Sequence, residues 1–268
     1  MFNLRFYSAK STAGINLEKP VHAAYSHWSE FAYLIPDTVI REVRNMPKNV
    51  SSLIQPDCSV AAFIAGQMLG NASIYNFCTK HNSRFTLRQA ANLRSLSYCA
   101  ITAMFLEHID QGNGIIRLYR TQSGSWTLDI QSKRTKLWNE ARTFWYPNGV
   151  KSIPRNIGAF LSNLGIAVWI MSSGGRNGSA ATAGTEFYTQ SFDKNQLVWI
   201  KTAMNHKYKL QLYLAPGKIL QNGKHGWRLR GDSYDGQRMR IFFAHLMHES
   251  WHYKFPVVNL RLNTEQDM

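Results

Sequence analysis

Hydrophobic residues recur at helical spacing along three stretches between residues 59 and 109. In 59–75, with Ser59 as a candidate N-cap, apolar residues fall near one helical face: Val60, Phe63, Ile64, Met68 and Leu69. In the second stretch, "FTLRQAANL", Thr86 can cap a helix whose inner face is formed by Leu87, Ala90 and Leu93. The third stretch, "YCAITAMFLEHI", follows a short turn at 94–97 and turns three side chains inward: Ile101, Phe105 and Ile109. The pattern predicts three helices.

The spacing then changes from helical to alternating. "GIIRLYR", residues 114–120, and "SWTLDI", residues 125–130, alternate apolar with polar side chains, and "TQSG" between them can form a turn. We therefore predict a β-hairpin directly after the third helix.

This order of three helices and a hairpin resembles the winged helix-turn-helix superfamily over residues 59–131. "TLRQAANLRSLSYCAI", residues 86–101, is similar to its two-helix motif without gaps, although Arg94 or Ser95 replaces a turn glycine. The resemblance implies a DNA-binding unit whose last helix enters the major groove. The alternative is a unit that only packs against the rest of the protein or a partner.

The second half of the chain predicts a basic sheet. "HKYKLQLYL", residues 206–214, alternates apolar and basic side chains as a strand does. In "KILQNGKHGWRLR", Asn222 and Gly223 favour a two-residue hairpin turn before a second strand. The basic face of these strands can follow a phosphate backbone, or it can be an ordinary solvated face. Its cationic residues are Lys207, Lys209, Arg228 and Arg230.

The charge of the chain indicates an anionic partner. Thirty-one Lys and Arg residues stand against sixteen Asp and Glu residues, a formal net charge of +15. Nine basic and three acidic residues fall in 59–137, and eleven basic and five acidic in 201–268, so these two regions hold most of the excess. Nucleic acid is the partner we expect; the alternative is that the charge only keeps the protein soluble or allows contact with anionic lipid.

Cysteine content and apolar runs indicate the compartment. The three cysteines are odd in number and have no CxxC spacing, which argues against a disulfide framework or a cysteine-based zinc site: Cys58, Cys78 and Cys99. The first ten residues, "MFNLRFYSAK", lack the apolar core of a signal peptide, and "GIAVWIM", residues 165–171, is too short to cross a bilayer. We therefore expect a cytoplasmic protein.

The candidate nucleic-acid contacts follow from the resemblance and from the basic strands. The predicted groove helix offers only Ser97, Tyr98 and Thr102, which are weak base readers compared with Arg, Lys, Asn or Gln. Phosphate contacts are better supplied, by Lys80, Arg84, Arg88, Arg94, Arg117, Arg120 and Ser123, together with the four cations of the second half. Backbone positioning or shape recognition is therefore the expected mode of binding.

The sharpest catalytic hypothesis is the HExxH match in "HLMHESWH", residues 245–252. In such a motif His248 and His252 would hold zinc, and Glu249 would activate water. No longer zinc-protease extension follows, and the downstream candidates for a third ligand are Glu265 and Asp267. A structural or binding helix is the preferred interpretation. A metal-dependent nuclease has no supporting pattern in the remaining acidic candidates, Asp232, Asp235 and Glu249.

Taken together, the sequence predicts an α+β protein in three parts. Residues 1–56 pack on the rest, 57–131 form the winged-helix module, and 132–268 form a basic region of helices and antiparallel strands, with a mobile Gly/Ser loop at 172–184. We detect no internal repeat. The expected function is non-catalytic binding of duplex DNA, as in replication initiators or regulators, without cofactor or metal. The alternatives are a DNA- or RNA-binding subunit of a nucleoprotein complex, such as an RNA-guided (CRISPR-type) assembly, and an HExxH zinc hydrolase.

Overall fold

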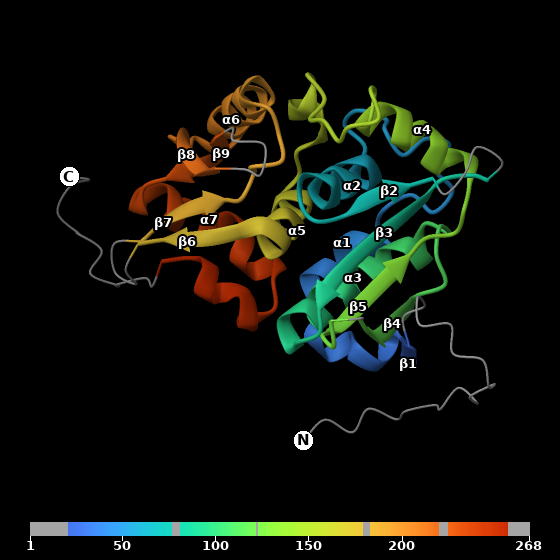
Figure 1. The fold of residues 1–268 in the computed structure, drawn as a ribbon. Helices are drawn as coiled ribbons and strands as arrows, with labels where there is room; N and C mark the ends of the chain where they lie inside the picture. The colour runs from blue at the N-terminus through green and yellow to red at the C-terminus, as the bar shows by residue number, and fades with distance from the viewer. Residues whose placement is uncertain (1–20, 77–80, 122, 179–182, 220–224, 257–268) are drawn as a thin grey trace.

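The computed structural model describes residues 21–76, 81–121, 123–178, 183–219 and 225–256 (Figure 1). No helix within these ranges is long and apolar enough to span a bilayer. The chain begins with β1 (Val21–His27), the 3-10 helix η1 (Trp28–Leu34) and α1 (Asp37–Arg44). After these elements the same succession of helices and strands occurs twice.

Each of the two repeats runs helix, strand, strand, helix, strand, strand, helix. The elements of the first are α2 (Ser59–Leu69), β2 (Ser73–Tyr75), β3 (Arg84–Ala90), α3 (Leu93–His108), β4 (Ile115–Arg120), β5 (Trp126–Gln131) and α4 (Lys136–Trp145). Those of the second are α5 (Asn163–Ser173), β6 (Gly174–Asn177), β7 (Gly184–Phe187), α6 (Lys194–Tyr208), β8 (Tyr213–Ile219), β9 (His225–Gly231) and α7 (Ser233–Phe243). Three short 3-10 helices complete the described chain: η2 (Ile157–Phe160), η3 (Ala244–Leu246) and η4 (Glu249–Lys254).

The two sheets have the same strand order. The first is β1-β4-β5-β3-β2 and the second is β6-β7-β9-β8. Without β1, and with the second sheet read from β8, the strands of each repeat lie in the order third, fourth, second and first. All strand pairs in both sheets are antiparallel. The expectation that the chain has no internal repeat was therefore wrong, because the repeat lies in the topology and not in matching residues.

Helices α2 and α5 pack against each other between the two sheets (Figure 1). Both are apolar around their whole circumference, as expected for helices with no solvent-exposed face. Their backbones touch because glycine faces glycine: a Cβ on Gly66 would lie 2.0 Å from the carbonyl oxygen of Gly165, and one on Gly165 would lie 2.4 Å from that of Ala62. This contact joins the two halves into one hydrophobic core.

The predicted winged helix is not present, because residues 84–90 form a strand and not a helix. Phe85 and Leu87 are buried, whereas the neighbouring Thr86 is partly exposed and Arg88 is exposed. This alternation is the two-residue period of a strand, here β3. Strand β3 pairs with β2 on one side and β5 on the other. The expected turn at 94–97 lies inside α3, whose first turn is capped by Asn92, with its side chain accepting from the Ser95 amide at 3.0 Å.

Two other predicted segments can be compared with the structure. The hairpin at 114–130 is confirmed as β4 and β5, but these strands lie within a five-stranded sheet and do not form a separate wing. The predicted strand at 206–214 was wrong: α6 runs to Tyr208, Lys209 adopts a left-handed conformation with φ of 53°, and β8 starts at Tyr213. The apolar side chains at Leu210 and Leu212 are buried there in the link between helix and strand.

The remaining predicted segments lie partly outside the described residues. Strands β8 and β9 pair as an antiparallel hairpin, but Asn222 and Gly223, the predicted turn, lie outside the described ranges. Within 172–184, where we expected a loop, Ser172 and Ser173 end α5, residues 174–177 form β6, and Gly184 begins β7.

Candidate nucleic-acid interface

The first sheet presents a polar face on the side away from α3. Alternation along β3, β4 and β5 turns the apolar residues toward the helices and leaves polar side chains on the opposite face. Cross-strand pairing sets Arg88 and Arg117 on either side of Asp129, and Thr86 beside Gln131. The centre of this face is therefore a carboxylate flanked by two arginines.

Asp129 is buried although it belongs to the polar face. Its side chain is 3% exposed and is surrounded by donors: Arg88 Nε at 3.2 Å, Arg117 Nη1 at 3.8 Å and Gln131 Nε2 at 2.7 Å. These contacts compensate the cost of removing the carboxylate from water. The Arg88 side chain, by contrast, is 65% exposed, so its guanidinium is both anchored and accessible.

Positive charge is crowded around this cluster. Burial and the nearby guanidinium groups of Arg134 and Arg117 lower the pKa of Arg84. The repulsion between like charges in the free protein decreases when an anion binds between them. The polar face of the first sheet is therefore suited to a polyanion.

The second sheet carries a matching cluster around Glu186. The side chain of Glu186 is 5% exposed and accepts from Arg228 Nη1 at 2.9 Å and from Arg230 Nε at 2.5 Å. Arg230 lies directly opposite Glu186 in the pairing of β7 with β9. Each half of the protein thus has one buried carboxylate between two arginines on its sheet.

A second pair of repeated features lies at the C-terminal ends of α2 and α5. Lys151 Nζ donates to the carbonyl oxygens of Gly70 at 2.8 Å and Ala72 at 2.7 Å. Lys254 Nζ donates to the carbonyl oxygens of Ile170 at 2.7 Å and Met171 at 2.9 Å. An ammonium group at a helix end donates hydrogen bonds to its carbonyls and opposes its negative dipole. Burial nevertheless lowers the pKa of each lysine to about 7.

The two helix ends also contact each other directly. Asn71 Nδ2 donates to the carbonyl oxygen of Ser172 at 3.2 Å, and the hydroxyl oxygens of Ser172 and Ser173 lie 3.1 Å apart. The side chains offered at this junction are thus an amide and two hydroxyls. Across the described part of the chain, no group of three or more His, Cys, Asp or Glu side chains is arranged to hold a metal ion.

Three predicted base contacts are inaccessible. Ser97, Tyr98 and Thr102 are each 0% exposed, because α3 lies inside the core. The Tyr98 hydroxyl donates to Gln67 Oε1 at 2.6 Å, and the Thr102 hydroxyl donates to the Tyr98 carbonyl at 2.9 Å. Their assignment as groove contacts was wrong, since it depended on α3 being a surface helix.

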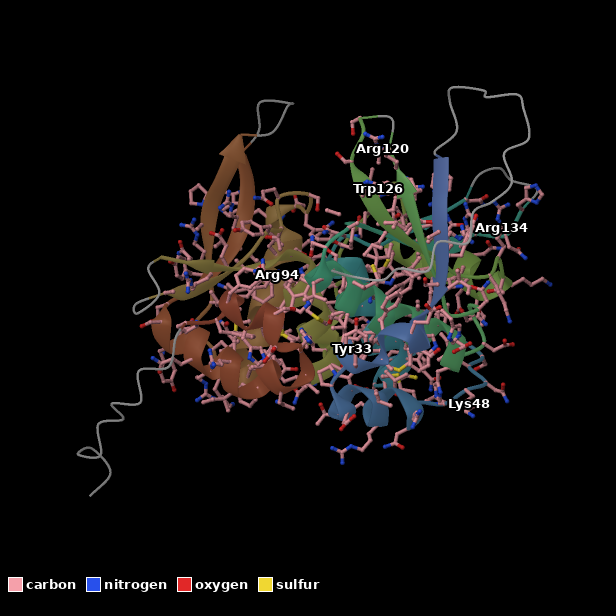
Figure 2. The ribbon with its side chains drawn as sticks, turned by 90° about the horizontal axis from the view of Figure 1, so that it is seen from below. Tyr33, Lys48, Arg94, Arg120, Trp126 and Arg134 are labelled. Atoms are coloured by element: carbon pink, nitrogen blue, oxygen red, sulfur yellow. The ribbon has the colours of Figure 1, made fainter. Side chains whose placement is uncertain are left out.

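The predicted cationic residues lie in several places. On the polar faces of the sheets are Arg84, Arg88, Arg117, Arg228 and Arg230. Arg120 and Ser123 flank the β4–β5 turn, and Figure 2 shows Arg120 near the hairpin tip with Trp126. The Arg94 guanidinium lies over the ring of Tyr253, 4.1 Å from its centroid. Lys207 donates to the Leu161 carbonyl, Lys209 ends α6, and Lys80 lies outside the described residues. Contact of these residues with nucleic acid stays a prediction.

The sequence analysis missed the residues that organise these clusters: Asp129, Glu186, Lys151 and Lys254. One signal was available, namely two short and largely apolar stretches that have no charged residue and each end at a glycine, "SVAAFIAGQMLG" and "NLGIAVWIMSSG". Two such helices in one chain indicate a buried pair, because a helix without a polar face needs a partner.

The HExxH segment does not form a zinc-binding helix. Residues 249–254 are the 3-10 helix η4, and His248 precedes it as the N-cap, with Nδ1 accepting from the Ser250 amide at 3.2 Å. His252 Nε2 lies 2.9 Å from the carbonyl oxygen of Ala244. The two imidazoles are thus used in local hydrogen bonds, and the helical spacing required by the motif is absent. The other acidic candidates serve α7: Asp232 caps it, and Asp235 accepts from the Gln211 amide at 2.8 Å.

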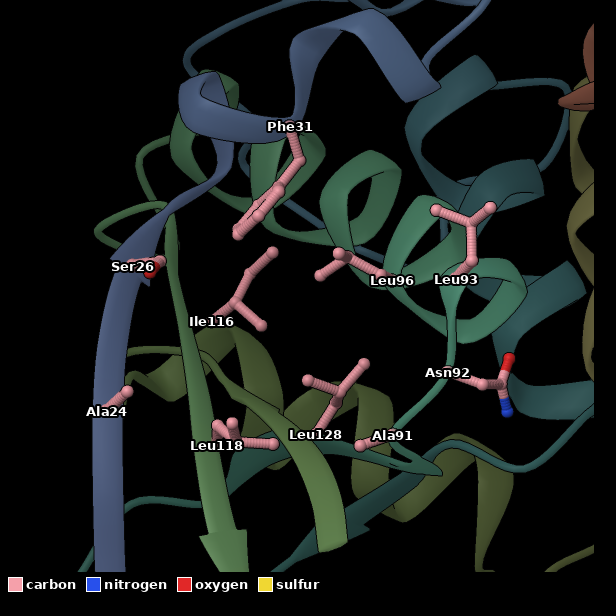
Figure 3. Close-up of a pocket in the computed structure, with 10 residues that line it drawn as sticks. All are labelled: Ala24, Ser26, Phe31, Ala91, Asn92, Leu93, Leu96, Ile116, Leu118 and Leu128. Carbon is pink, nitrogen blue, oxygen red and sulfur yellow. The ribbon is translucent and has the colours of Figure 1, made fainter. Parts of the chain in front are cut away.

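An apolar pocket lies on the opposite side of the first sheet from Asp129. It has a volume of about 240 Å³ and is enclosed by β1, η1, the strands β4 and β5, and the start of α3 (Figure 3). Phe31, Leu96, Ile116 and Leu128 form much of its wall, and no charged side chain lines it. It is therefore separate from the cationic surface.

Comparison with known proteins identifies a family. The model of the LAGLIDADG DNA endonuclease family matches residues 61–253, well over half of the chain. The chain is 31% identical over 119 residues to the cytochrome b mRNA maturase bI2 of Debaryomyces hansenii, covering 44% of this chain and 41% of the maturase. It is 22% identical over 191 residues to the maturase of the same name from Saccharomyces cerevisiae, covering 65% of this chain and 42% of that protein. These matches span about two fifths of either relative.

A solved structure shares the fold. The structure described as the homing endonuclease I-WcaI bound to its DNA recognition sequence superposes with a TM-score of 0.58 at 15% sequence identity. The match covers 86% of this chain and 99% of that chain, so it includes both repeats.

These findings overturn two expectations and support a third. The resemblance to winged helix-turn-helix proteins was wrong, because the matched family model spans both repeats. The expectation of a non-catalytic protein was also wrong at the level of the family, which is described as a family of DNA endonucleases. The expectation of a nucleic-acid partner is confirmed at that same level. The chain belongs to the LAGLIDADG DNA endonuclease family.

Proposed function

We propose that the protein binds a DNA duplex across the polar faces of its two sheets, each half covering one half of an extended site. The observation that carries this proposal is the repeated cluster of a buried carboxylate and two arginines, once around Asp129 and once around Glu186. Antiparallel strands fit within the major groove, and long polar side chains on their outer face reach base edges and phosphates.

The electrostatics of the whole chain support the same function. A net charge of +15 attracts a polyanion over a distance of about 10 Å at 0.1 M salt. Crowding of Arg84 by Arg117 and Arg134 leaves positive charge on the sheet that Asp129 does not neutralise. Binding should therefore release counterions and weaken steeply as salt rises.

A divalent metal, which nucleases commonly use to hydrolyse phosphodiesters, does not fit the residues at the joined helix ends. Magnesium requires hard oxygen ligands, usually including carboxylates. At this junction Asn71 provides an amide already bonded to Ser172, and Ser172 and Ser173 provide hydroxyls. Lys151 and Lys254 close the same helix ends with ammonium groups, which oppose a cation. This set of donors does not support metal-assisted cleavage of a phosphodiester at the junction.

A second candidate function is binding to a structured region of messenger RNA. The observation that favours it is that the junction of α2 and α5 presents an amide and two hydroxyls in place of the carboxylates that a metal-dependent nuclease needs. The two curated relatives are named as mRNA maturases, and the chain spans about two fifths of their lengths. An A-form duplex would meet the sheets mainly through its phosphates and 2′-hydroxyls.

Removing one cation from the β4–β5 hairpin is expected to weaken DNA binding. Arg120 lies near the hairpin tip, and its Nε donates to the Gly124 carbonyl at 3.0 Å. In Arg120→Ala, the slope of log affinity against log salt should become shallower by about 1, because one phosphate contact is lost. Fluorescence anisotropy with a labelled random duplex at several salt concentrations measures this slope.

The matched control is Lys48→Ala, because Lys48 is an exposed cation far from Arg120 (Figure 2). This variant removes the same unit of charge and should leave the slope unchanged. Equal slopes for Arg120→Ala and the native protein would argue against the hairpin as a contact surface. Tighter binding to an RNA duplex than to DNA at both salt extremes would favour the second candidate.

A further inference from the structure

The two carboxylate clusters hold their arginines in the same manner. Arg88 meets Asp129 through Nε at 3.2 Å, and Arg230 meets Glu186 through Nε at 2.5 Å. A guanidinium held at Nε still presents two N–H donors side by side on the edge formed by Nη1 and Nη2. In each half, an arginine is therefore fixed at one edge and leaves a fork of donors for a ligand.

The carboxylates are positioned to orient these forks and not to contact the ligand. Asp129 and Glu186 have side chains 3% and 5% exposed, whereas those of Arg88 and Arg230 are 65% and 29% exposed. The oxygens of Asp129 are also occupied by Arg117 and Gln131. An arginine whose Nε is already bound to a carboxylate loses less side-chain conformational entropy when it binds a ligand than an unbound arginine does.

The chemistry of the ligand follows from the negative charge beside each fork. The carboxylate offsets one of the two positive charges of its cluster, and its own negative charge weakens the attraction of the adjacent fork for a phosphate. The edge of guanine carries no net charge and presents two acceptors, O6 and N7, whose spacing matches the fork. The clusters are therefore better suited to guanine than to the DNA backbone.

We propose that Arg88 and Arg230 each recognise a guanine in the major groove, one in each half of the site, and that Asp129 and Glu186 are positioning residues. This inference rests on the proposed binding of duplex DNA and adds a base preference to it.

The strand positions add a property of the site. Arg88 lies on β3 and its carboxylate on β5, whereas in the corresponding strands of the second half the carboxylate lies on β7 and Arg230 on β9. The two partners have exchanged strands between halves. The two guanines are therefore not related by an exact two-fold axis, and the recognised sequence is not a perfect palindrome.

The experiment selects binding sites from a randomised DNA duplex library with the full chain. The native protein should enrich one strongly preferred guanine in each half of an asymmetric site. Arg88→Lys should lose the preference at one of these positions and retain the other, and Arg230→Lys should do the reverse, because lysine keeps the charge but lacks the fork. Arg44→Lys, at an exposed arginine on α1, is the matched control and should retain both guanines.

The selected duplex allows a direct measurement of each contact. Replacing either guanine by 7-deazaguanine removes one acceptor and should weaken binding of the native protein by roughly tenfold, the lower part of the range for a bidentate pair. The Arg88→Lys protein should bind with equal affinity whether guanine or 7-deazaguanine occupies the position that Arg88 recognises. Asp129→Asn should bind with a reduced guanine preference; if it fails to fold, the Arg88→Lys result decides, since that side chain is mostly exposed.

The outcomes separate this inference from the proposed function. If the Arg88→Lys and Arg230→Lys proteins both still enriched the two guanines, the inference would be overturned and the proposed DNA binding would stand. A perfectly palindromic site would also overturn it. Failure to enrich any duplex, together with salt-independent binding, would contradict the proposed function itself.

Discussion

Gly66→Ala is expected to lower the free energy of unfolding by about 3 kcal/mol or more, with Gly165→Ala having a similar effect. A Cβ at Gly66 would lie 2.0 Å from the Gly165 carbonyl oxygen, and one at Gly165 would lie 2.4 Å from that of Ala62. Both obstacles are backbone atoms, so no side-chain rotation can relieve the overlap. The helices α2 and α5 must separate, which opens the core between the two halves. Urea denaturation followed by circular dichroism measures the change.

Gly158→Ala is the matched control for this prediction. The added methyl would meet the Ala203 side chain at 3.3 Å, a contact that a small displacement can accommodate. Its effect on the free energy of unfolding should be below about 1 kcal/mol. If Gly66→Ala and Gly158→Ala were equally stable, the backbone contact of α2 with α5 would not be a determinant of the fold.

The second large effect is a dependence of stability on pH caused by Lys151 and Lys254. Burial lowers the pKa of both amines to about 7, whereas an unfolded lysine titrates near pH 10.4. Between these values the unfolded chain binds more protons, so stability is lost as pH falls through this window and changes no further below pH 7 from this cause. The slope is up to about 1.4 kcal/mol per pH unit for each lysine.

Lys151→Met should remove the contribution of one lysine to this slope. Denaturation midpoints measured from pH 7 to about pH 8.5 give the comparison. Burial raises the pKa of Cys99, Tyr98 and Tyr208, and these acids oppose the trend at higher pH. Lys48→Met replaces an exposed lysine and should leave the slope unchanged. If Lys151→Met kept the full native slope, the buried amine would not be the group that titrates.

Local pattern predicted part of the fold correctly. The helix at 59–69 and the hairpin at 115–131 are both present, since the spacing of apolar residues and the choice of turn residues act over a few positions. The same reasoning failed at 84–90, where seven residues are too few to distinguish a helix from a strand. Pairing with β2 and β5 decides that segment, and β5 is separated from it in the chain by α3 and β4.

Of the candidate site, only its positive charge could be predicted from the sequence. Arginines such as Arg88 and Arg230 were identified from basic strands, but Ser97 and Thr102 were assigned to a surface that does not exist. The partner Asp129 was missed because it is separated from Arg88 by 41 positions in the chain. An isolated aspartate in an alternating strand carries no signal that two arginines will close around it.

By itself, the sequence determined that this protein has helices and antiparallel strands and a surplus of cations suited to nucleic acid, because period and net charge are sums over local residues. Only the tertiary structure decided that the chain is built from two repeats, that Gly66 packs on Gly165, and that each sheet centres on a buried carboxylate between arginines. Those features arise from contacts between residues far apart in the chain, whose free energies no local pattern contains.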